Sequence, residues 1–372
     1  MTVPTTSTTQ HTQQAAHGGE AYRVARALGI APETLLDLGT NANILCADLT
    51  RAIVAAEPYP HEHYPDLENT QLREALAQHE SVSPTQVVAG NGSAELLWLT
   101  LQALRPARAL LLGPLFSEYE RACTALHIPF DVISPPAAQG YVPHTAELHA
   151  IATSSADMVI LCTPNNPGTV VYDNMHAIVQ ACGERTVLID NTYREFLWGT
   201  PAYAANAWQT YRQQAHPNAR LITLHSLTKF FHCPGIRLGY ALTDAATATH
   251  LQQVRAPWMV STFAEHMGMR LIASIDAYRQ RLPLLRAHGS ALRHALAATG
   301  VFQGLPLLGV SFLTGRLRSP ITAATVREHL LQQHILVRNC DNITGMEPGH
   351  IRIQIRSVRE LRPLLDALTA LA

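Results

Sequence analysis

Short apolar runs with the length of a buried strand recur through the middle of the chain. They begin at residues 109, 158, 186, 220 and 238 and read ALLLG, MVILC, TVLID, RLITL and LGYAL. Segments with helical periodicity lie around the earlier runs, at 93–105 and 118–126. Strands that alternate with helices form mostly parallel sheets that are covered on both faces. We therefore expect an α/β fold with a mostly parallel central sheet flanked by helices.

Length and a change of pattern predict two domains around that sheet. The chain has 372 residues, of which 47% are hydrophobic, and this is too long for one small core. We expect a large domain at 46–257. After it the pattern changes to long helical stretches, so we expect 258–372, together with 17–45, to form a smaller α+β domain. The polar residues 1–16 predict a disordered tail.

Charge and cysteine usage exclude several classes of protein. The formal net charge is -1 and no run of basic residues stands out, so no nucleic-acid partner is expected. No apolar stretch reaches the roughly 20 residues of a membrane helix, and the N-terminus lacks the pattern of a signal peptide. Six scattered cysteines are typical of reduced thiols in the cytoplasm. His61 and His63 lack a third ligand cluster, so no metal is expected.

Lys229 is the only lysine in a chain with 27 Lys and Arg residues, so the other 26 are arginines. Arginine can replace lysine as a surface charge, but only an amine can lose its proton and condense with an aldehyde. Lys229 follows the apolar run at 220, and Ser226 and Thr228 lie beside it. Amine chemistry is thus favoured over the alternative, a lysine retained by chance in a loop.

Two further features suit an anionic phosphate. Arg237 lies eight residues after Lys229 and can clasp phosphate oxygens with its planar guanidinium. The turn GNGSAE at 90–95 precedes a helix, so the backbone N–H groups of Ser93 and Ala94 would point at an anion. An aldehyde that carries a phosphate, pyridoxal 5'-phosphate (PLP), fits the lysine and both phosphate seats.

PLP also needs a carboxylate for its pyridine nitrogen. Asp190, at the end of the run TVLID, can supply it, while Asn166 in TPNNPG and Tyr193 could donate to the ring oxygen O3'. Each has a structural alternative, because Asp190 could cap a helix and PNNPG could be a simple turn. Their position at the ends of successive strands favours the cofactor site.

The motifs TPNNPG, DNTY and SLTK followed by PGIRLGY resemble those of the fold-type I PLP enzymes of the class I/II aminotransferase group, over residues 17–372. The resemblance implies that Lys229 forms the Schiff base, with Asp190 at the ring nitrogen, Asn166 and Tyr193 at O3', and Tyr119 at the ring-stacking position. It places around the phosphate Ser93, Ala94, Ser226, Thr228 and Arg237. Tyr64, in HYPD, resembles a tyrosine lent to the neighbouring subunit's phosphate, which implies a homodimer with shared sites.

Two regions resemble a narrower subfamily, the threonine-phosphate decarboxylases of cobalamin biosynthesis, which are relatives of the histidinol-phosphate aminotransferases. They are HGG at 17–19 with LLDLGTNAN, and ILVRNCDNITGM with HIRIQIR. The likeness places around a phosphorylated amino acid His17, Gly18, Asn41, Asn166, Arg338 and Arg352.

The alternation in HIRIQIR predicts a half-buried strand, on which Arg352 and Arg356 share a face roughly 13 Å apart. One anion cannot bridge both arginines. We expect Arg352, with Arg338, to bind substrate anions, because a doubly anionic substrate needs two cationic anchors. For Arg356 a solvated strand face is favoured.

The leading interpretation is decarboxylation of L-threonine O-3-phosphate or a close analogue. The alternative is an aminotransferase of histidinol-phosphate type, and a third is a catalytically silent PLP-binding protein. The chain departs from its relatives at Asn191-Thr192, where Glu-Ala is usual, and at Pro167-Gly168-Thr169, where Pro-Thr-Gly is usual. NAN at 41–43 also lacks the usual following proline. These departures leave both the substrate and the choice of reaction open.

Overall fold

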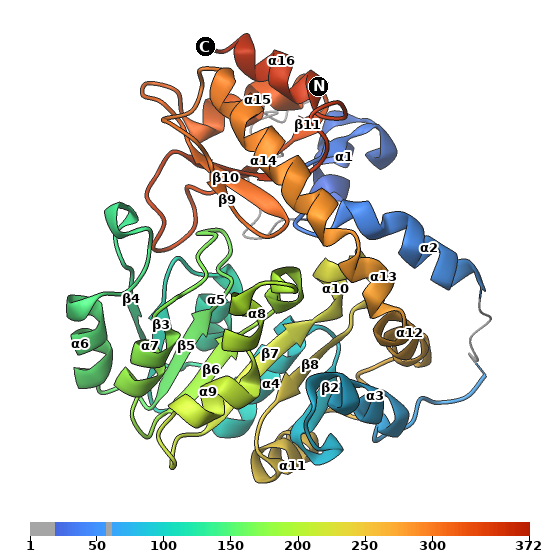
Figure 1. Ribbon diagram of the computed structural model, residues 1–372, viewed down its shortest axis with the longest axis vertical. Helices are drawn as coiled ribbons and strands as arrows, with labels where there is room; N and C mark the ends of the chain where they lie inside the picture. Colours follow the sequence, from blue (N-terminus) through green and yellow to red (C-terminus); the bar gives the residue numbers. More distant parts are fainter. Residues whose placement is uncertain (1–18, 57–61) are drawn as a thin grey trace, which may run out of the picture.

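A computed structural model of the chain describes residues 19–56 and 62–372. The expected tail at 1–16, the predicted substrate residues His17 and Gly18, and His61 lie outside the described residues. Figure 1 shows a large central sheet with helices on both faces, and a smaller group of strands and helices above it.

The central sheet has seven strands and is mostly parallel, which confirms the predicted fold class. The strand β8 alone runs antiparallel to its two neighbours, β2 and β7. From one edge to the other the order is β2 (Val87–Gly90), β8 (Gly239–Leu242), β7 (Leu221–Ser226), β6 (Thr186–Asp190), β5 (Met158–Cys162), β3 (Ala109–Leu112) and β4 (Phe130–Ile133).

The five predicted apolar runs are β3, β5, β6, β7 and β8, and all are buried because helices cover both faces of the sheet. Alternate residues enter two cores. In β5, Met158 and Ile160 pack with the first helix group, whereas Val159 and Leu161 pack with the second. The first group is α4 (Ser93–Leu104), α5 (Ser117–Ala125) and α11 (Ala245–Val254). The second includes α3 (Thr70–Glu80), α7 (Met175–Ala181), α9 (Trp208–Gln214) and α12 (Thr262–Ala273).

The edge strand β4 was not predicted. Its residues are only partly buried and it contains Asp131, so it lacks the continuous apolar pattern of the inner strands. Among the residues that the structure describes, no helix is both long and apolar enough to cross a bilayer. All six cysteines lie in the described part and are free, buried thiols.

The smaller group contains a sheet in the order β12-β13-β10-β9. Its strands are β9 (Leu307–Leu308), β10 (Phe312–Arg316), β12 (Arg338–Asn339) and β13 (His350–Gln354), and its helices are α14 (Leu282–Ala298), α15 (Ala323–Leu331) and α16 (Arg362–Thr369). The N-terminal strand β1 (Leu36–Asp37) pairs in parallel with β11 (Ile335–Leu336). In Figure 1 the N-terminal helix α1 (Ala21–Leu28) accordingly lies beside the C-terminal elements.

The sequence predicted a half-buried strand at 350–356, and this prediction was wrong in its length and its burial. The strand β13 ends at Gln354 and is buried on both faces. The segment 39–42 covers the polar face, because Gln354 Nε2 donates to the Ala42 carbonyl at 2.7 Å and Arg352 Nη2 donates to the Gly39 carbonyl at 2.6 Å. Arg356 lies beyond the strand and donates to the Asp37 carbonyl at 3.1 Å, so the expected solvated strand face is wrong.

Candidate functional site

The carboxyl ends of the central strands open into a cavity of about 500 Å³, where ligands bind in sheets of this kind. Lys229 lies in its wall, on the short helix α10 (Leu227–Phe230) that directly follows β7. Six of the residues predicted from the sequence line the cavity together: Asn41, Ala94, Asn166, Lys229, Arg338 and Arg352. The segment around Asn41 is tied to the helix, since Asn43 N donates to the Lys229 carbonyl at 2.8 Å.

The amine of Lys229 is easier to deprotonate than an exposed one. Burial lowers its pKa from 10.5 to about 8, and the positive charges of Arg352 and Arg237 act in the same direction. Asp190 opposes the shift. A substantial fraction of the amine is therefore neutral near physiological pH, which is the form that attacks a carbonyl carbon.

Asp190 stands at the end of β6 and its two carboxylate oxygens accept different hydrogen bonds. Tyr119 donates its hydroxyl to Oδ2 at 2.8 Å, and the backbone N–H of Thr192 donates to Oδ1 at 3.0 Å. Burial raises the pKa of the carboxyl group, while these donors and Lys229 lower it. The two bonds hold the carboxylate in one orientation.

Tyr119 does not line the cavity, although the resemblance implied the ring-stacking position for it. Its side chain is 1% exposed, its hydroxyl points at Asp190, and it is not among the cavity-lining residues. Phe116, one helical turn earlier, lines the cavity and meets the Tyr119 ring edge to face, with 5.7 Å between ring centroids. The sequence signal for Phe116 was an aromatic residue in the loop between β3 and α5, and it was not singled out from the sequence.

At the predicted anion site before α4, two glycines allow the backbone and a guanidinium to approach closely. Gly92 has a φ of +85°, and a Cβ there would lie 2.5 Å from Arg237 Nη2. A Cβ on Gly239 would lie 2.7 Å from the backbone nitrogen of Ser93. Both positions therefore require glycine. The result is that the first N–H groups of α4 and the guanidinium of Arg237 are brought together.

Hydroxyl groups surround the same corner. Ser226 and Thr228 share a hydrogen bond between their side-chain oxygens at 2.7 Å, and Thr192 Oγ1 donates to Ser93 Oγ at 3.3 Å. The last bond joins the turn after Asp190 to the first residue of α4. Arg237 is exposed, and its Nη1 donates to the Pro234 carbonyl at 3.1 Å.

Asn166 and Arg352 meet in the cavity wall, where Arg352 Nη1 donates to Asn166 Oδ1. The guanidinium carbon of Arg352 also lies 5.2 Å from the ring centre of Phe312. Within 19–56 and 62–372, the buried Nε of Arg352 has no hydrogen-bond partner. This arginine is thus fixed by protein contacts yet retains a buried donor.

Tyr193 and Arg338 complete the predicted set around the cavity. Asn41 Nδ2 donates to the Tyr193 hydroxyl at 2.6 Å, so Tyr193 lies directly behind a cavity-lining residue. Arg338 is buried on β12 and donates to the Asn339 carbonyl at 2.7 Å and to Asn342 Oδ1 at 2.8 Å.

Tyr64 is separate from the other predicted residues. It is 79% exposed and its ring stacks on Trp258, with 4.6 Å between ring centroids. Trp258 was not singled out from the sequence, and its exposed fraction is 46%. Tyr64 does not line the cavity of its own chain.

The departures from the relatives have local structural explanations. Asn191 is buried, and its Nδ2 donates to the Asn206 carbonyl at 2.9 Å. Gly168 N donates to Asn165 Oδ1 at 2.8 Å, and a Cβ on Gly168 would lie 2.6 Å from that same oxygen. The turn after Asn166 therefore requires glycine at 168.

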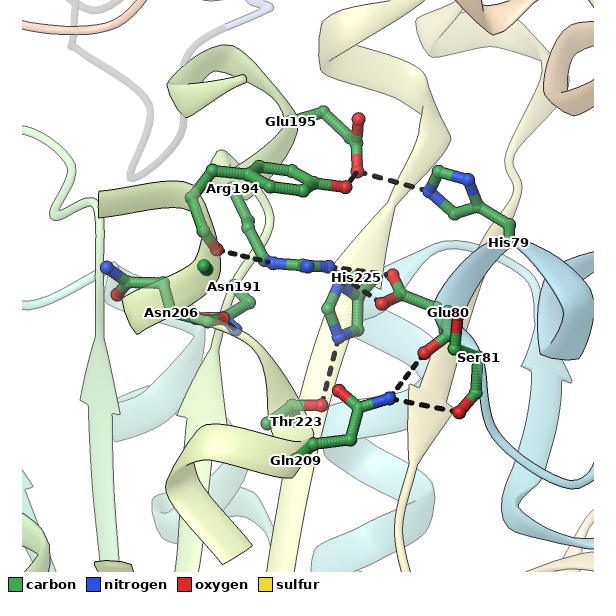
Figure 2. A network of polar contacts seen from close by, with 12 residues as sticks. His79, Glu80, Ser81, Asn191, Arg194, Glu195, Asn206, Gln209, Thr223 and His225 are labelled. Atoms are coloured by element: carbon green, nitrogen blue, oxygen red, sulfur yellow. Dashed lines mark hydrogen bonds and ion pairs between the residues drawn. The ribbon is translucent and has the colours of Figure 1, made fainter. Parts of the chain in front are cut away.

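A second polar cluster, which we call the charged network, lies beside the site and is drawn in Figure 2. Its centre is Glu80, which accepts two hydrogen bonds from Arg194 Nη1, at 2.7 and 3.0 Å, and one from the Tyr240 hydroxyl. His79 and Glu195 share a hydrogen bond at 3.2 Å. Ligating atoms of His79, Glu80 and Glu195 lie within 4.8 Å of one another, but guanidinium groups already neutralise both carboxylates.

The residues at the strand ends fit PLP. The chain supplies a buried amine of lowered pKa, a buried carboxylate held by two donors, and a helix start at which Gly92 leaves room for a guanidinium. These groups match the aldehyde, the ring nitrogen and the phosphate of that cofactor. The fit rests on this set of donors and acceptors.

A sequence model for aminotransferase class I and II matches residues 33–368. The chain belongs to the class I and II aminotransferase family. It is 31% identical over 365 residues to the threonine-phosphate decarboxylase of Salmonella typhimurium, covering 95% of both chains. It is 28% identical over 315 residues to the histidinol-phosphate aminotransferase of an Acidovorax species, covering 82% of both chains.

Solved structures of class I and II aminotransferases share the fold. The crystal structure of histidinol-phosphate aminotransferase from Sinorhizobium meliloti, in complex with PLP, superposes with a TM-score of 0.76 at 18% identity. The match covers 100% of this chain and 99% of that one. The predicted fold type is thereby confirmed, and the chain is an enzyme of a PLP-dependent family.

Proposed function

We propose that this protein binds PLP and decarboxylates a small O-phosphorylated amino acid, L-threonine O-3-phosphate or a close analogue. The observation that carries the proposal is one cavity that contains the single lysine together with Arg338 and Arg352. A substrate with a carboxylate and a phosphate offers two anions to these two guanidinium groups. The likeness to the Salmonella typhimurium threonine-phosphate decarboxylase supports the same substrate class.

The cofactor would be held at both ends. Asp190 would accept a hydrogen bond from the protonated ring nitrogen, and Asn166 and Tyr193 would donate to O3'. Phe116 is in place to cover a ring face, in the role first assigned to Tyr119. The phosphate would be bound by Ser93, Ala94, Ser226, Thr228 and Arg237. When bound, PLP supplies an electron-accepting ring that weakens whichever bond at the substrate Cα stands perpendicular to it.

The chain's own residues decide which bond that is. Arg352 is fixed by Asn166 and by the Gly39 carbonyl, so it can hold the substrate carboxylate in one direction. Arg338 would bind the second anion, with Asn41 and the residues His17 and Gly18 completing the substrate site. Lys229, with its pKa near 8, can hold a proton and return it to Cα after the carboxylate leaves.

Transamination is the alternative, and the 28% identity to histidinol-phosphate aminotransferases supports it. It follows if the arginines hold the carboxylate in the ring plane, so that the Cα–H bond is perpendicular instead. A silent PLP-binding protein is a third possibility, against which the paired Lys229 and Asp190 argue.

One experiment separates the three. The purified, PLP-loaded protein is mixed with O-phospho-L-threonine, and released CO2, keto acid and the state of the cofactor are measured. CO2 release with a phosphoamine product supports decarboxylation. A keto acid with conversion of PLP to pyridoxamine phosphate supports transamination instead. No turnover of this substrate, of histidinol phosphate or of other phosphorylated amino acids and amines would overturn both enzymatic proposals.

We further infer a homodimer with shared sites, located in the cytoplasm. The exposed, stacked pair Tyr64 and Trp258 supports the dimer, because Tyr64 does not line the cavity of its own chain and its ring is open to another subunit. The free thiols of all six cysteines agree with a reducing compartment.

A further inference from the structure

Tyr119 and Asp190 form a closed pair in the wall behind the cavity. The Tyr119 hydroxyl donates to Asp190 Oδ2 at 2.8 Å, and both side chains are buried, with exposed fractions of 1% and 6%. Tyr119 is not among the residues that line the cavity, and its ring packs against Phe116, which is. Its hydroxyl is therefore placed to act on the carboxylate.

A donor to one oxygen changes what the carboxylate does with its other partner. Hydrogen bonds to an ionised carboxylate stabilise the charge and weaken its affinity for a proton. Burial works in the opposite direction at Asp190, where it raises the pKa of the group. Without the Tyr119 hydroxyl, the hydrogen bonds from Thr192 and the charge of Lys229 would remain to oppose that effect.

We propose that Tyr119 is a positioning residue that keeps Asp190 ionised, so that a proton shared between Asp190 and the ring nitrogen of bound PLP stays on the nitrogen. This inference rests on the proposed function. The proton balance is simple: one proton lies between the ring nitrogen and the carboxylate, and the phenol keeps its own proton throughout. A protonated ring is the stronger electron acceptor, so Tyr119 raises the rate without touching substrate or cofactor.

The neighbouring strand adds a reason for such a donor. Cys162 stands beside Asp190 in the sheet register, and the pKa of its thiol is raised well above the usual value by burial and by the Asp190 charge. It therefore stays a neutral thiol, adds no second negative charge beside Asp190 and supplies no cation to balance that carboxylate. Among the described residues, Tyr119 and Thr192 supply the hydrogen bonds to the carboxylate in this wall.

Tyr172 offers a matched control in the core on the other face of the sheet. It is 2% exposed, and its buried hydroxyl has no hydrogen-bond partner in the described part of the chain. Burial raises its pKa, as does the nearby Cys162. Tyr172→Phe, like Tyr119→Phe, removes one buried phenol oxygen, but it breaks no hydrogen bond to Asp190.

The test uses protein reconstituted with PLP that carries ¹⁵N in the ring, so that the nitrogen chemical shift reports the position of the proton. Wild type and Tyr172→Phe should give the shift of a protonated pyridine. Tyr119→Phe should move the shift toward the neutral ring, and Asp190→Asn should move it furthest. For Tyr119→Phe we expect kcat to fall about tenfold, with KM changed less than about twofold, because a lost hydrogen bond to a charged group weakens the acceptor.

A second variant strengthens the hydrogen bond instead of removing it, and so separates the proposed effect from a folding defect. Site-specific incorporation of 3-fluorotyrosine in place of Tyr119 keeps the ring size and makes the phenol a stronger donor, so the ¹⁵N shift should stay at or beyond the wild-type protonated value. A ¹⁵N shift in Tyr119→Phe that equals that of wild type, in protein loaded at Lys229, would overturn the inference alone. Wild-type protein that takes up no PLP at Lys229 would overturn the proposed function instead.

Discussion

The cavity and the charged network are two buried polar regions built from residues that are adjacent in the sequence. They differ in how fully their charges and hydrogen-bonding groups are paired. Ser226 and Tyr193 lie on the cavity side. Their chain neighbours His225 and Arg194 belong to the charged network. In the network the Glu80 carboxylate faces Arg194, and the pKa of Glu80 is lowered to about 2 despite its burial. In the cavity wall several cationic side chains lie together, and among residues 19–56 and 62–372 the buried Arg352 Nε finds no hydrogen-bond acceptor.

This difference indicates that the two regions have different roles, one in binding and one in stabilising the fold. A buried charge without a partner costs free energy, so a region that gathers such groups needs a rigid surrounding. The network is placed to provide it, because Arg194 and His225 are chain neighbours of site residues. The cavity keeps binding capacity for anions, and the network fixes the backbone that carries it.

The largest effect should follow from removing the amine. Lys229→Ala should lower turnover at least about 10³-fold, because no other lysine can replace it in either region. The variant should also lose the absorbance band of covalently bound PLP. Lys229→Arg keeps the positive charge but cannot condense with an aldehyde, so it should be equally inactive. Substantial turnover in either variant would remove the basis for the cavity's assigned role.

Glu80→Gln breaks the network and should destabilise the fold by about 3–5 kcal/mol, since it leaves Arg194 as a buried, uncompensated charge. Urea denaturation of the cofactor-free protein measures the loss. Asp366→Asn removes an exposed ion pair with Arg362, whose side chains are 66% and 74% exposed, and should cost less than about 1 kcal/mol. Equal losses in the two variants would contradict the claim that the network stabilises the site.

Arg352→Gln should raise the KM for the phosphorylated substrate by about 10- to 100-fold, because a charge-assisted hydrogen bond in a buried site is lost. Steady-state kinetics over a wide substrate range measures the change. Arg356→Gln is the matched control on the same segment, since Arg356 does not line the cavity and its guanidinium binds the Asp37 carbonyl and Gln354 Oε1. If Arg356→Gln had the larger effect on KM, the assignment of the two arginines would be reversed.

The smallest effect concerns pH. Only the neutral amine captures PLP, and the pKa of Lys229 is lowered to about 8, so the capture rate of cofactor-free protein should rise with pH. We expect about a tenfold rise per pH unit below 8 and a plateau above it. The appearance of the absorbance band of bound PLP after mixing measures this rate. A rate that continues to rise beyond pH 10 would describe an ordinary exposed lysine instead.

Much of the central sheet could be predicted from the sequence, because each inner strand is buried on both faces and reads as a continuous apolar run. The edge strand β4 could not, since one face meets solvent and its residues are mixed. Asp190 and Lys229 could be placed at the site because they directly follow such runs. Their chemical roles remain proposals.

Side-chain direction was harder to predict. Tyr119 and Phe116 lie one helical turn apart at the same strand end, and the sequence alone did not separate the residue that faces the cavity from the one that faces Asp190. Arg356 was expected on a solvated strand face, but the strand stops earlier and the segment before Asn41 covers it.

The sequence by itself determined which runs form the inner strands, because burial on both faces of a sheet demands apolar residues. It also determined Lys229 as the single side-chain amine, because imine chemistry demands lysine. The tertiary structure alone decided which donors reach Asp190, which arginine enters the cavity and how Glu80 is neutralised. Those contacts join residues from distant parts of the chain, and they exist only once both layers of helices are packed.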